Sequence, residues 1–208
     1  MLGVQLDLPD YLKRIGDELA KIDLGAVERL SEKLFEAYEQ GRFIFICGNG
    51  GSATNASHIA EDLGKSAFKE SDLHADCIKR LKIMSLTDNV GWITALGNDM
   101  GYDQIFVQQL AAYAGEGDVL IAISCSGNSR NVLTAVDWAN RHGLFTYGMT
   151  GYDGGKLKQL AHDGLHVAVA DTGMVEALHG CVFHWVVDDL YARVYKTGRY
   201  EADQPCVS

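Results

Sequence analysis

The sequence predicts an α/β protein in which a parallel sheet is covered by helices on both faces. Short apolar runs that resemble buried strands, at residues 43–46, 118–124 and 144–150, alternate along the chain with longer amphipathic segments. Such alternation is typical of parallel sheets, because each parallel connection crosses the sheet and leaves a helix on one face. The first two runs also end in small, Gly- or Ser-rich turns that precede a helix.

Length and charge favour a single domain without an extended polyanion-binding surface. The 208 residues suffice for one α/β domain with a sizeable core, and are few for two. We expect N-terminal helices over 1–40, the sheet and its covering helices over 42–197, and a tail over 198–208 without a recognisable pattern. A formal net charge of -10 argues against nucleic acid or anionic membrane as a partner, because clustered Lys and Arg bind those surfaces.

The cysteines and the short apolar runs favour a reduced, aqueous compartment. The five cysteines show no CxxC pattern, and the N-terminal segment lacks the apolar core of a signal peptide. No apolar run approaches the length that spans a bilayer. The sequence therefore predicts a cytoplasmic protein with free thiols.

Residues 8–40 are predicted to form two amphipathic helices that precede the sheet. Apolar side chains recur at helical spacing in both, and Asp23-Leu24-Gly25 separates them. The following run at 43–46 is aromatic and β-branched, which predicts the first buried strand.

The turn after this strand, Gly48-Asn49-Gly50-Gly51-Ser52, is predicted to hold a phosphate. Its glycines let the backbone turn sharply and leave N–H groups uncovered, and the Ser52 hydroxyl is expected to cap the next helix. Unpaired amides and the helix dipole both favour an anion at such a position.

The helix after this turn carries a candidate acid–base pair. His58 and Asp62 are four residues apart, so both project from one face, with Glu61 beside them. We expect the pair to place an imidazole and a carboxylate beyond the bound phosphate. The alternative is an ordinary polar helix surface, and the neighbouring turn favours the functional interpretation.

The next segments return the chain to the sheet. Residues 65–82 are polar with mixed charge, which predicts an irregular, solvated connection. A strand is predicted at 83–86, a short helix that ends at Gly97-Asn98-Asp99, and a further helix over 102–113.

A second strand, turn and helix repeat the pattern of the first. The strand at 118–124 leads into the turn 124–129, Ser-Cys-Ser-Gly-Asn-Ser, and a helix over 130–141. Serine hydroxyls and backbone amides converge there without a bulky side chain, which again suits a phosphate. The pKa of the Cys125 thiol is expected to fall at this helix N-terminus, although its neighbours suit phosphate contact better than nucleophilic attack.

The last part of the chain completes the alternation. A strand at 144–150 precedes a Gly-rich turn at 151–155, a short helix and a weak strand at 165–169. The final helix, predicted over 174–195, is apolar around nearly its whole circumference. A surface helix of a monomer keeps a polar face, so this pattern predicts a subunit interface and a homo-oligomer. The role of His179 within it stays open.

Nucleotide cofactors are less well supported. Neither turn has the GxxxxGK[ST] pattern of proteins that bind nucleoside triphosphates with magnesium. The first turn fits the dinucleotide pattern GxGxx[GA] with Gly48, Gly50 and Ala53. That pattern requires an acidic residue about 20 positions further on, at a strand end. The acidic candidates between residues 70 and 76 lie in a region without clear strand character.

Five short motifs in order resemble a known family. They are GNGGSA at 48–53, HIAEDL at 58–63, GND at 97–99, SCSGNS at 124–129 and MTGYDGG at 149–155. With the N-terminal helices, they resemble the sugar isomerase (SIS) domain, in particular the phosphoheptose isomerase group, from residue 42 to about 161.

The resemblance implies both a fold and an activity. It implies a flavodoxin- or Rossmann-like three-layer αβα sandwich with a five-stranded parallel sheet, and a homotetramer with sites at subunit interfaces. It also implies conversion of sedoheptulose 7-phosphate to D-glycero-D-manno-heptose 7-phosphate.

The resemblance further assigns residues to the site. Those that it places around the phosphosugar are Asn49, Gly50, Gly51, Ser52, Asn98, Asp99, Ser124, Cys125, Ser126 and Ser129. In the family, a His and a Glu on the helix after the first turn, with a Gln and a His eight apart on the last helix, bind zinc and serve catalysis. The corresponding residues here are His58, Asp62, Glu176 and His184, so that Asp replaces Glu and Glu replaces Gln.

These residues can supply the chemistry of an aldose–ketose isomerisation, which requires a base, an acid and stabilisation of an enediolate. Asp62, Glu176 and His184 are the candidate acids and bases. Zinc held by His58 and these three residues is the candidate for enediolate stabilisation. Because Asp is one methylene shorter than Glu, we hypothesise that Glu176 takes over part of the base role while Asp62 chiefly holds metal.

Two other functions stay open at the level of sequence. Some similar proteins bind phosphosugars without catalysis, such as the module that associates with the bacterial replication initiator. Those generally lack the acid–base and metal set, so the four residues favour an enzyme. Arabinose 5-phosphate isomerases are a second alternative, although no appended regulatory domain is visible in the sequence.

Overall fold

Five short runs of the chain form the strands of one parallel sheet. In the computed structural model, which describes residues 1–201, the strand order is β2-β1-β3-β4-β5, and every neighbouring pair is parallel. The strands are β1 (Phe43–Gly48), β2 (Lys82–Ser85), β3 (Val119–Ser124), β4 (Phe145–Thr150) and β5 (Asp163–His166). The predicted five-stranded parallel sheet is confirmed.

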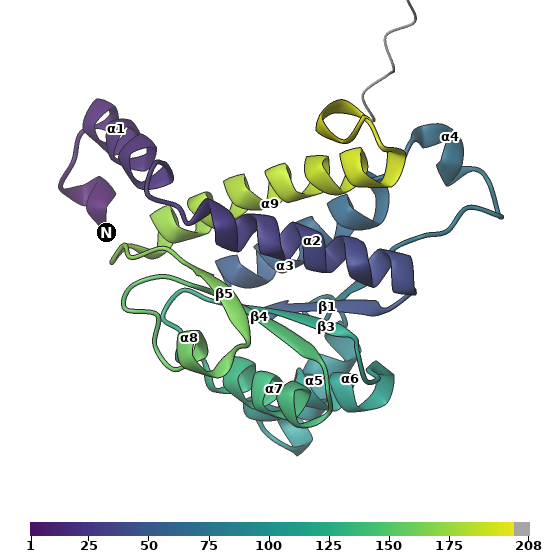
Figure 1. Cartoon of the computed structure of the whole chain (residues 1–208). Helices are drawn as coiled ribbons and strands as arrows, with labels where there is room; N and C mark the ends of the chain where they lie inside the picture. The colour runs from purple at the N-terminus through teal and green to yellow at the C-terminus, as the bar shows by residue number, and fades with distance from the viewer. Residues whose placement is uncertain (202–208) are drawn as a thin grey trace, which may run out of the picture.

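Helices cover both faces of this sheet, which gives the three layers seen in Figure 1. One face carries α2 (Leu24–Gln40), α3 (Gly51–Lys65) and α9 (Thr172–Tyr195), and α1 (Leu8–Leu19) contacts α9. The other face carries α5 (Val90–Asp99), α6 (Val107–Tyr113), α7 (Arg130–Arg141) and α8 (Leu157–Leu160). Within residues 1–201, no helix combines the length and the apolarity needed to cross a membrane.

The alternation of side chains along the strands creates two cores. In β1, Ile44 and Ile46 belong to the core beneath α2, α3 and α9, whereas Phe45 and Cys47 belong to the core on the other face. All four are fully buried. Burial on both faces explains why these strands are continuous apolar runs rather than alternating ones.

The strand order reverses between β1 and β3, which brings the two predicted turns together. From β1 the chain passes to β2 on one side, then returns to β3 on the other side of β1. Gly48 at the end of β1 pairs with Ile123 near the end of β3, so the two turns leave the sheet beside each other. Doubly wound sheets bind ligands outside the carboxyl ends of their strands at such a reversal.

Several elements differ from those predicted. The helix predicted over 102–113 is divided into a 3-10 turn, Tyr102–Gln104, and α6. β5 spans 163–166 rather than 165–169, because Asp163 and His166 pair with β4 although neither is apolar. The connection over 65–82, predicted as irregular, contains one helical turn, α4 (Glu70–Leu73).

α9 is buried on more than one side within a single chain. Its apolar side chains share a core with α2 and α3. The apolar circumference that predicted a subunit interface is therefore explained inside one chain, and homo-oligomerisation stays a prediction.

The first residues of the predicted tail are anchored to α9. Arg199 and Tyr200, in a 3-10 turn over Gly198–Tyr200, donate hydrogen bonds of 2.9 Å to the buried carboxylate of Asp189. The sequence carries no recognisable pattern here, because these contacts depend on Asp189 in α9. Residues 202–208 lie outside the described residues.

Candidate functional site

The turn after β1 leads directly into α3. Gly50 has φ 56° and ψ -124°, a conformation that residues with side chains rarely adopt, and α3 begins at Gly51. Within residues 1–201, no side chain caps this helix. The predicted cap by Ser52 is therefore wrong: Ser52 lies in the first turn of α3, and its Oγ is 3.6 Å from Sγ of Cys125.

Asn49 connects the two turns. Its side-chain amide exchanges two hydrogen bonds of 2.8 Å with the amide of Asn131, in the first turn of α7. Its Oδ1 also accepts a hydrogen bond of 3.0 Å from the Tyr102 hydroxyl. These contacts fix the first turn against the second.

The turn after β3 is organised by serine hydroxyls and a close backbone approach. Ser124 Oγ donates to Ser129 Oγ at 3.1 Å, and Ser126 Oγ accepts the N–H of Asn128 at 3.3 Å. A Cβ on Gly127, whose φ is 64°, would overlap the carbonyl oxygen of Gly154. The turn 151–155 therefore packs directly onto the serine turn.

A cavity of about 240 Å³ lies between these turns and the start of α9. It is lined by Asn49, Ser52, Ile123, Ser124, Cys125, Ser126, Ser129, Tyr152, Thr172 and Glu176. The structure thus brings together most of the predicted phosphosugar contacts and one of the predicted catalytic carboxylates. Its polar wall is made chiefly of hydroxyl and amide groups.

Glu176 enters this pocket from α9. Its carboxylate packs against the backbone of Gly51, where an added Cβ would overlap the carboxylate and displace it from this position. Burial raises the pKa of Glu176 above its ordinary value of 4.5. A carboxylate with a raised pKa beside a polar pocket is suited to accept a proton.

Cys125 is a poor nucleophile in this structure. Burial raises the pKa of its thiol, the Ser52 hydroxyl lowers it by less, and the charge of Glu176 raises it further. The predicted fall is wrong because α7 begins only at Arg130 and Cys125 lies buried behind the turn. The neutral thiol is consistent with a contact to the ligand.

A second group of predicted residues gathers between α3 and α9. His58 Nε2 and His184 Nδ1 lie 3.3 Å and 3.5 Å from the same carboxylate oxygen of Asp62. The imidazole rings are 55% and 59% exposed, whereas Asp62 is 16% exposed, so an ion reaches the group directly from solvent.

This group fits a divalent metal such as zinc. Zinc binds His nitrogen and carboxylate oxygen at about 2.0–2.2 Å in tetrahedral geometry, which separates neighbouring ligand atoms by about 3.3–3.5 Å. One ligand atom from each of the three residues lies within 4.8 Å of the others. Glu176, the fourth predicted ligand, is directed to Gly51 instead. The structure therefore brings together three members of the predicted set.

Asn55 connects the pocket to the histidine group. Its side-chain amide donates to the backbone carbonyl of Glu176 at 3.1 Å. It also lines a small cavity with His58, Asp62 and His184. The sequence did not single out Asn55, because its importance depends on the packing of α3 against α9.

The structure does not bring Asn98 and Asp99 into the pocket of the same chain. Both lie at the end of α5 with exposed side chains, and Asn98 Nδ2 donates to Asp99 Oδ1 at 2.7 Å. Their contact with the sugar stays a prediction.

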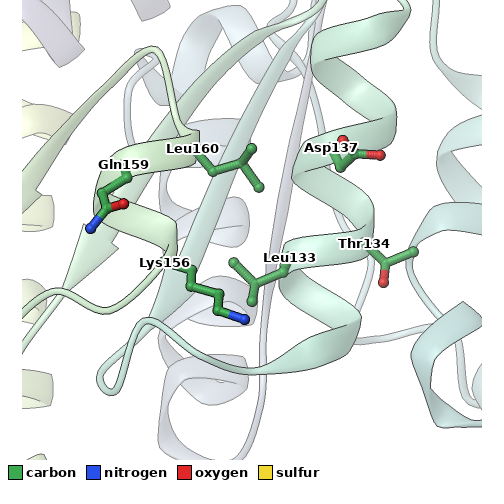
Figure 2. A pocket seen from close by; sticks show the side chains of 6 residues that line it. All are labelled: Leu133, Thr134, Asp137, Lys156, Gln159 and Leu160. Carbon is green, nitrogen blue, oxygen red and sulfur yellow. The ribbon is translucent and has the colours of Figure 1, made fainter.

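A larger hollow, of about 500 Å³, lies between α7 and α8 (Figure 2). It is lined by Leu133, Thr134, Asp137, Lys156, Gln159 and Leu160. It contains neither predicted turn and no imidazole, and Asp137 already pairs with Arg141. The smaller pocket at the strand ends is the better candidate site, because the chemistry and the strand reversal coincide there.

The dinucleotide alternative lacks its acidic residue. Glu70 and Asp72 lie in α4, and Asp76 lies in a turn, so none of them ends a strand. Together, the strand order, the Gly-rich and Ser-rich turns and Glu176 define a doubly wound domain of the phosphosugar-binding class.

Comparison with known proteins identifies the family within this class. A family model described as SIS domain matches residues 9–151. Phosphoheptose isomerase from Aliarcobacter butzleri is 40% identical over 153 residues, which cover 74% of this chain and 77% of the relative. Phosphoheptose isomerase from Chlorobium phaeobacteroides is 35% identical over 197 residues, which cover 94% of this chain and 84% of the relative.

Solved structures of similar proteins support the same family. Phosphoheptose isomerase from Neisseria gonorrhoeae superposes with a TM-score of 0.76 at 31% identity, covering 86% of this chain and 91% of that one. A phosphoheptose isomerase from Francisella tularensis superposes with a TM-score of 0.79 at 28% identity, covering 88% of this chain and 95% of that one. The chain belongs to the phosphoheptose isomerase family of SIS domain proteins.

Proposed function

We propose that the protein is an isomerase that converts sedoheptulose 7-phosphate to D-glycero-D-manno-heptose 7-phosphate. The observation that carries this proposal is that the Glu176 carboxylate lines the same pocket as the serine turn. A phosphosugar whose phosphate binds at that turn extends its carbon chain toward a base. The names of the relatives support a seven-carbon sugar as substrate.

In this proposal, the phosphate is bound by neutral donors. The hydroxyls of Ser52, Ser124, Ser126 and Ser129, near the N-termini of α3 and α7, suit an anion, which explains how an acidic chain binds one. Glu176 takes the proton from the carbon next to the carbonyl and returns it to the neighbouring carbon.

The histidine group serves the oxygens of the substrate. Asp62 and His184 are assigned to proton transfer between the two sugar oxygens, and Asn55 connects α3, which carries Asp62, to Glu176 on α9. His58, Asp62 and His184 are the residues that hold zinc in this proposal. When bound, the ion supplies positive charge that stabilises the enediolate.

The test is conversion of sedoheptulose 7-phosphate followed by NMR, with and without a chelator. We expect formation of the aldose phosphate by the wild-type protein and loss of activity with chelator that added zinc restores. No conversion across a panel of five- to seven-carbon ketose phosphates would contradict the proposal and favour a phosphosugar-binding module.

The same proposal includes a homotetramer with sites at subunit interfaces. It is supported by an apolar groove of about 290 Å³ between the N-terminal helices and α9. The groove is lined by Leu19, Ile22, Leu24, Val27, Glu28, Cys181, Val182 and Trp185. Leu8 and Leu12 on α1 are 69% and 57% exposed, so a second copy has apolar surface to cover.

We place this reaction in the cytoplasm. The proposal is supported by the free thiols of Cys47, Cys77, Cys125 and Cys181.

A further inference from the structure

Tyr152 has a backbone conformation that is unusual for a residue with a side chain. Its φ is 50°, and among residues 1–201 the other non-glycine residue with positive φ is Lys196, at the end of α9. Glycine adopts this conformation far more readily. A tyrosine held in it, next to a ligand pocket, is typical of strain that is kept for function.

Two hydrogen bonds attach Tyr152 to the segment that begins α9. Its N–H donates to the carbonyl of Val169 at 3.0 Å, and its hydroxyl lies 2.9 Å from Oγ1 of Thr172. Tyr152 and Thr172 both line the pocket together with Glu176. They belong to neither predicted phosphate-binding turn, so this part of the pocket wall is available to the carbon chain of the sugar.

The hydroxyl pair has hydrogen-bonding capacity to spare. Each hydroxyl has one hydrogen and two lone pairs, and the bond between them uses one hydrogen and one lone pair. One hydrogen and three lone pairs therefore stay available for a ligand. Tyr152 is 39% exposed and its hydrogen bond to Thr172 is itself exposed, so a sugar hydroxyl can reach this pair.

We propose that Tyr152, backed by Thr172, is a specificity-determining residue that binds a hydroxyl of the sugar chain. This inference rests on the proposed function, in which a ketose phosphate occupies the pocket. In this inference the phosphate lies at the serine turn, and the carbon chain of a seven-carbon sugar extends to the hydroxyl pair on the wall of the same pocket, which a five-carbon chain does not reach. Tyr152 thereby favours long ketose phosphates over short ones.

The test compares Tyr152→Phe with wild type on seven-carbon and five-carbon ketose phosphates. Loss of one neutral hydrogen bond should raise KM for the seven-carbon substrate about 3- to 10-fold. The kcat for that substrate and the KM for the five-carbon substrate should change less than about twofold. Thr172→Val should give the same pattern, whereas Tyr113→Phe, at an exposed position of α6, should match wild type.

A second variant removes the whole side chain of residue 152 without straining the backbone. Tyr152→Gly accepts the positive φ, so it should fold and should lose the same preference for the longer substrate. A structural role for Tyr152 alone would instead lower kcat equally for both substrates. Unchanged seven-carbon KM in both Tyr152 variants overturns the inference.

Calorimetric binding of sedoheptulose 7-phosphate separates this inference from the proposed function. If wild type neither binds nor converts the sugar, both fail. If wild type binds without converting, the proposed function fails alone, and a 3- to 10-fold weaker Kd for Tyr152→Phe still supports the inference. If wild type converts the sugar and Tyr152→Phe binds it equally well, only the inference fails.

Discussion

The Glu176 carboxylate occupies a position where the family pattern has an amide. An amide does not accept a proton from carbon, whereas a carboxylate does. Its position against Gly51 places this additional base in the wall of the pocket. In the proposed mechanism, the exchange from Gln to Glu at 176 compensates for the shorter Asp62 by placing a base closer to the turns.

The pH dependence of turnover tests this base. Because the base must be ionised and burial raises the pKa of Glu176 above 4.5, kcat/KM should fall as the pH drops through that raised pKa. Glu176→Gln should remove this acidic limb from the pH profile and lower the rate about 100- to 10,000-fold. Profiles between about pH 4 and pH 8 provide the measurement. Full turnover by Glu176→Gln, with none by Asp62→Asn, would assign the base to Asp62 instead.

Metal affinity tests the histidine group. His58→Ala or His184→Ala should weaken zinc binding at least about 10-fold, because each removes one of three ligands. His142→Ala is the matched control, since that exposed imidazole stacks on Trp138 outside the group. Calorimetric titration with zinc provides the measurement. Equal affinities in all three variants would exclude the group as the metal site.

The sequence predicted the residues of the two turns, but not the distant residues that hydrogen-bond to them. Gly-rich and Ser-rich turns after apolar strands are local patterns, so Ser124, Ser126 and Ser129 were found directly. Asn131 and Tyr102, which hold Asn49, are more than 50 positions away in the chain. No local pattern encodes such contacts, because they depend on how α7 and the α5–α6 connection pack onto the strand ends.

At the level of elements, the start of α9 controls where Glu176 lies. Asp171 caps this helix by accepting the N–H of Met174 at 3.0 Å, and it also accepts the N–H of Leu2 at 2.6 Å. These two amides lower the pKa of Asp171. The cap therefore connects the N-terminal segment to the helix that carries Glu176.

Asp171→Ala should lower the free energy of unfolding by about 1–2 kcal/mol at neutral pH. A lowered native pKa stabilises the protein above the unfolded value of 3.8, and this contribution is lost as pH falls through the native pKa. The difference from wild type should therefore shrink in acid. Urea titrations at neutral pH and near pH 3 measure it. Asp7→Ala, which removes the cap of peripheral α1, is the control and should cost less. A difference that persists unchanged in acid would contradict this account.

The elements themselves were predictable where burial is two-sided, and less so at the sheet edge. β1, β3 and β4 are continuous apolar runs, and their positions were confirmed within a few residues. β5 was misplaced because its start is polar. There Asp163 accepts two hydrogen bonds, of 2.7 Å and 3.0 Å, from Arg29 of α2. A contact across 134 positions thus stabilises an edge strand that lacks the local pattern.

For the whole molecule, the exposed apolar surface of α1 and the neighbouring groove predict assembly. Light scattering should give four times the 22.7 kDa mass of one chain. Leu12→Asp should yield a smaller species, because it places a charge in the proposed contact. Val90→Asp, at an exposed position on α5 across the sheet, should leave the assembly unchanged. A wild-type monomer at micromolar concentration would contradict the homotetramer.

The packing of α2 against α9 has a consequence for biosynthesis. Leu30 and Leu34 of α2 share a core with α9, and Ser31 bonds to Asp189, 158 positions later. The ribosome releases α2 long before α9 has been translated. One apolar layer of the nascent polypeptide therefore stays uncovered until synthesis is nearly complete. We expect chaperones to hold the growing chain until then, and chains that terminate before α9 to aggregate.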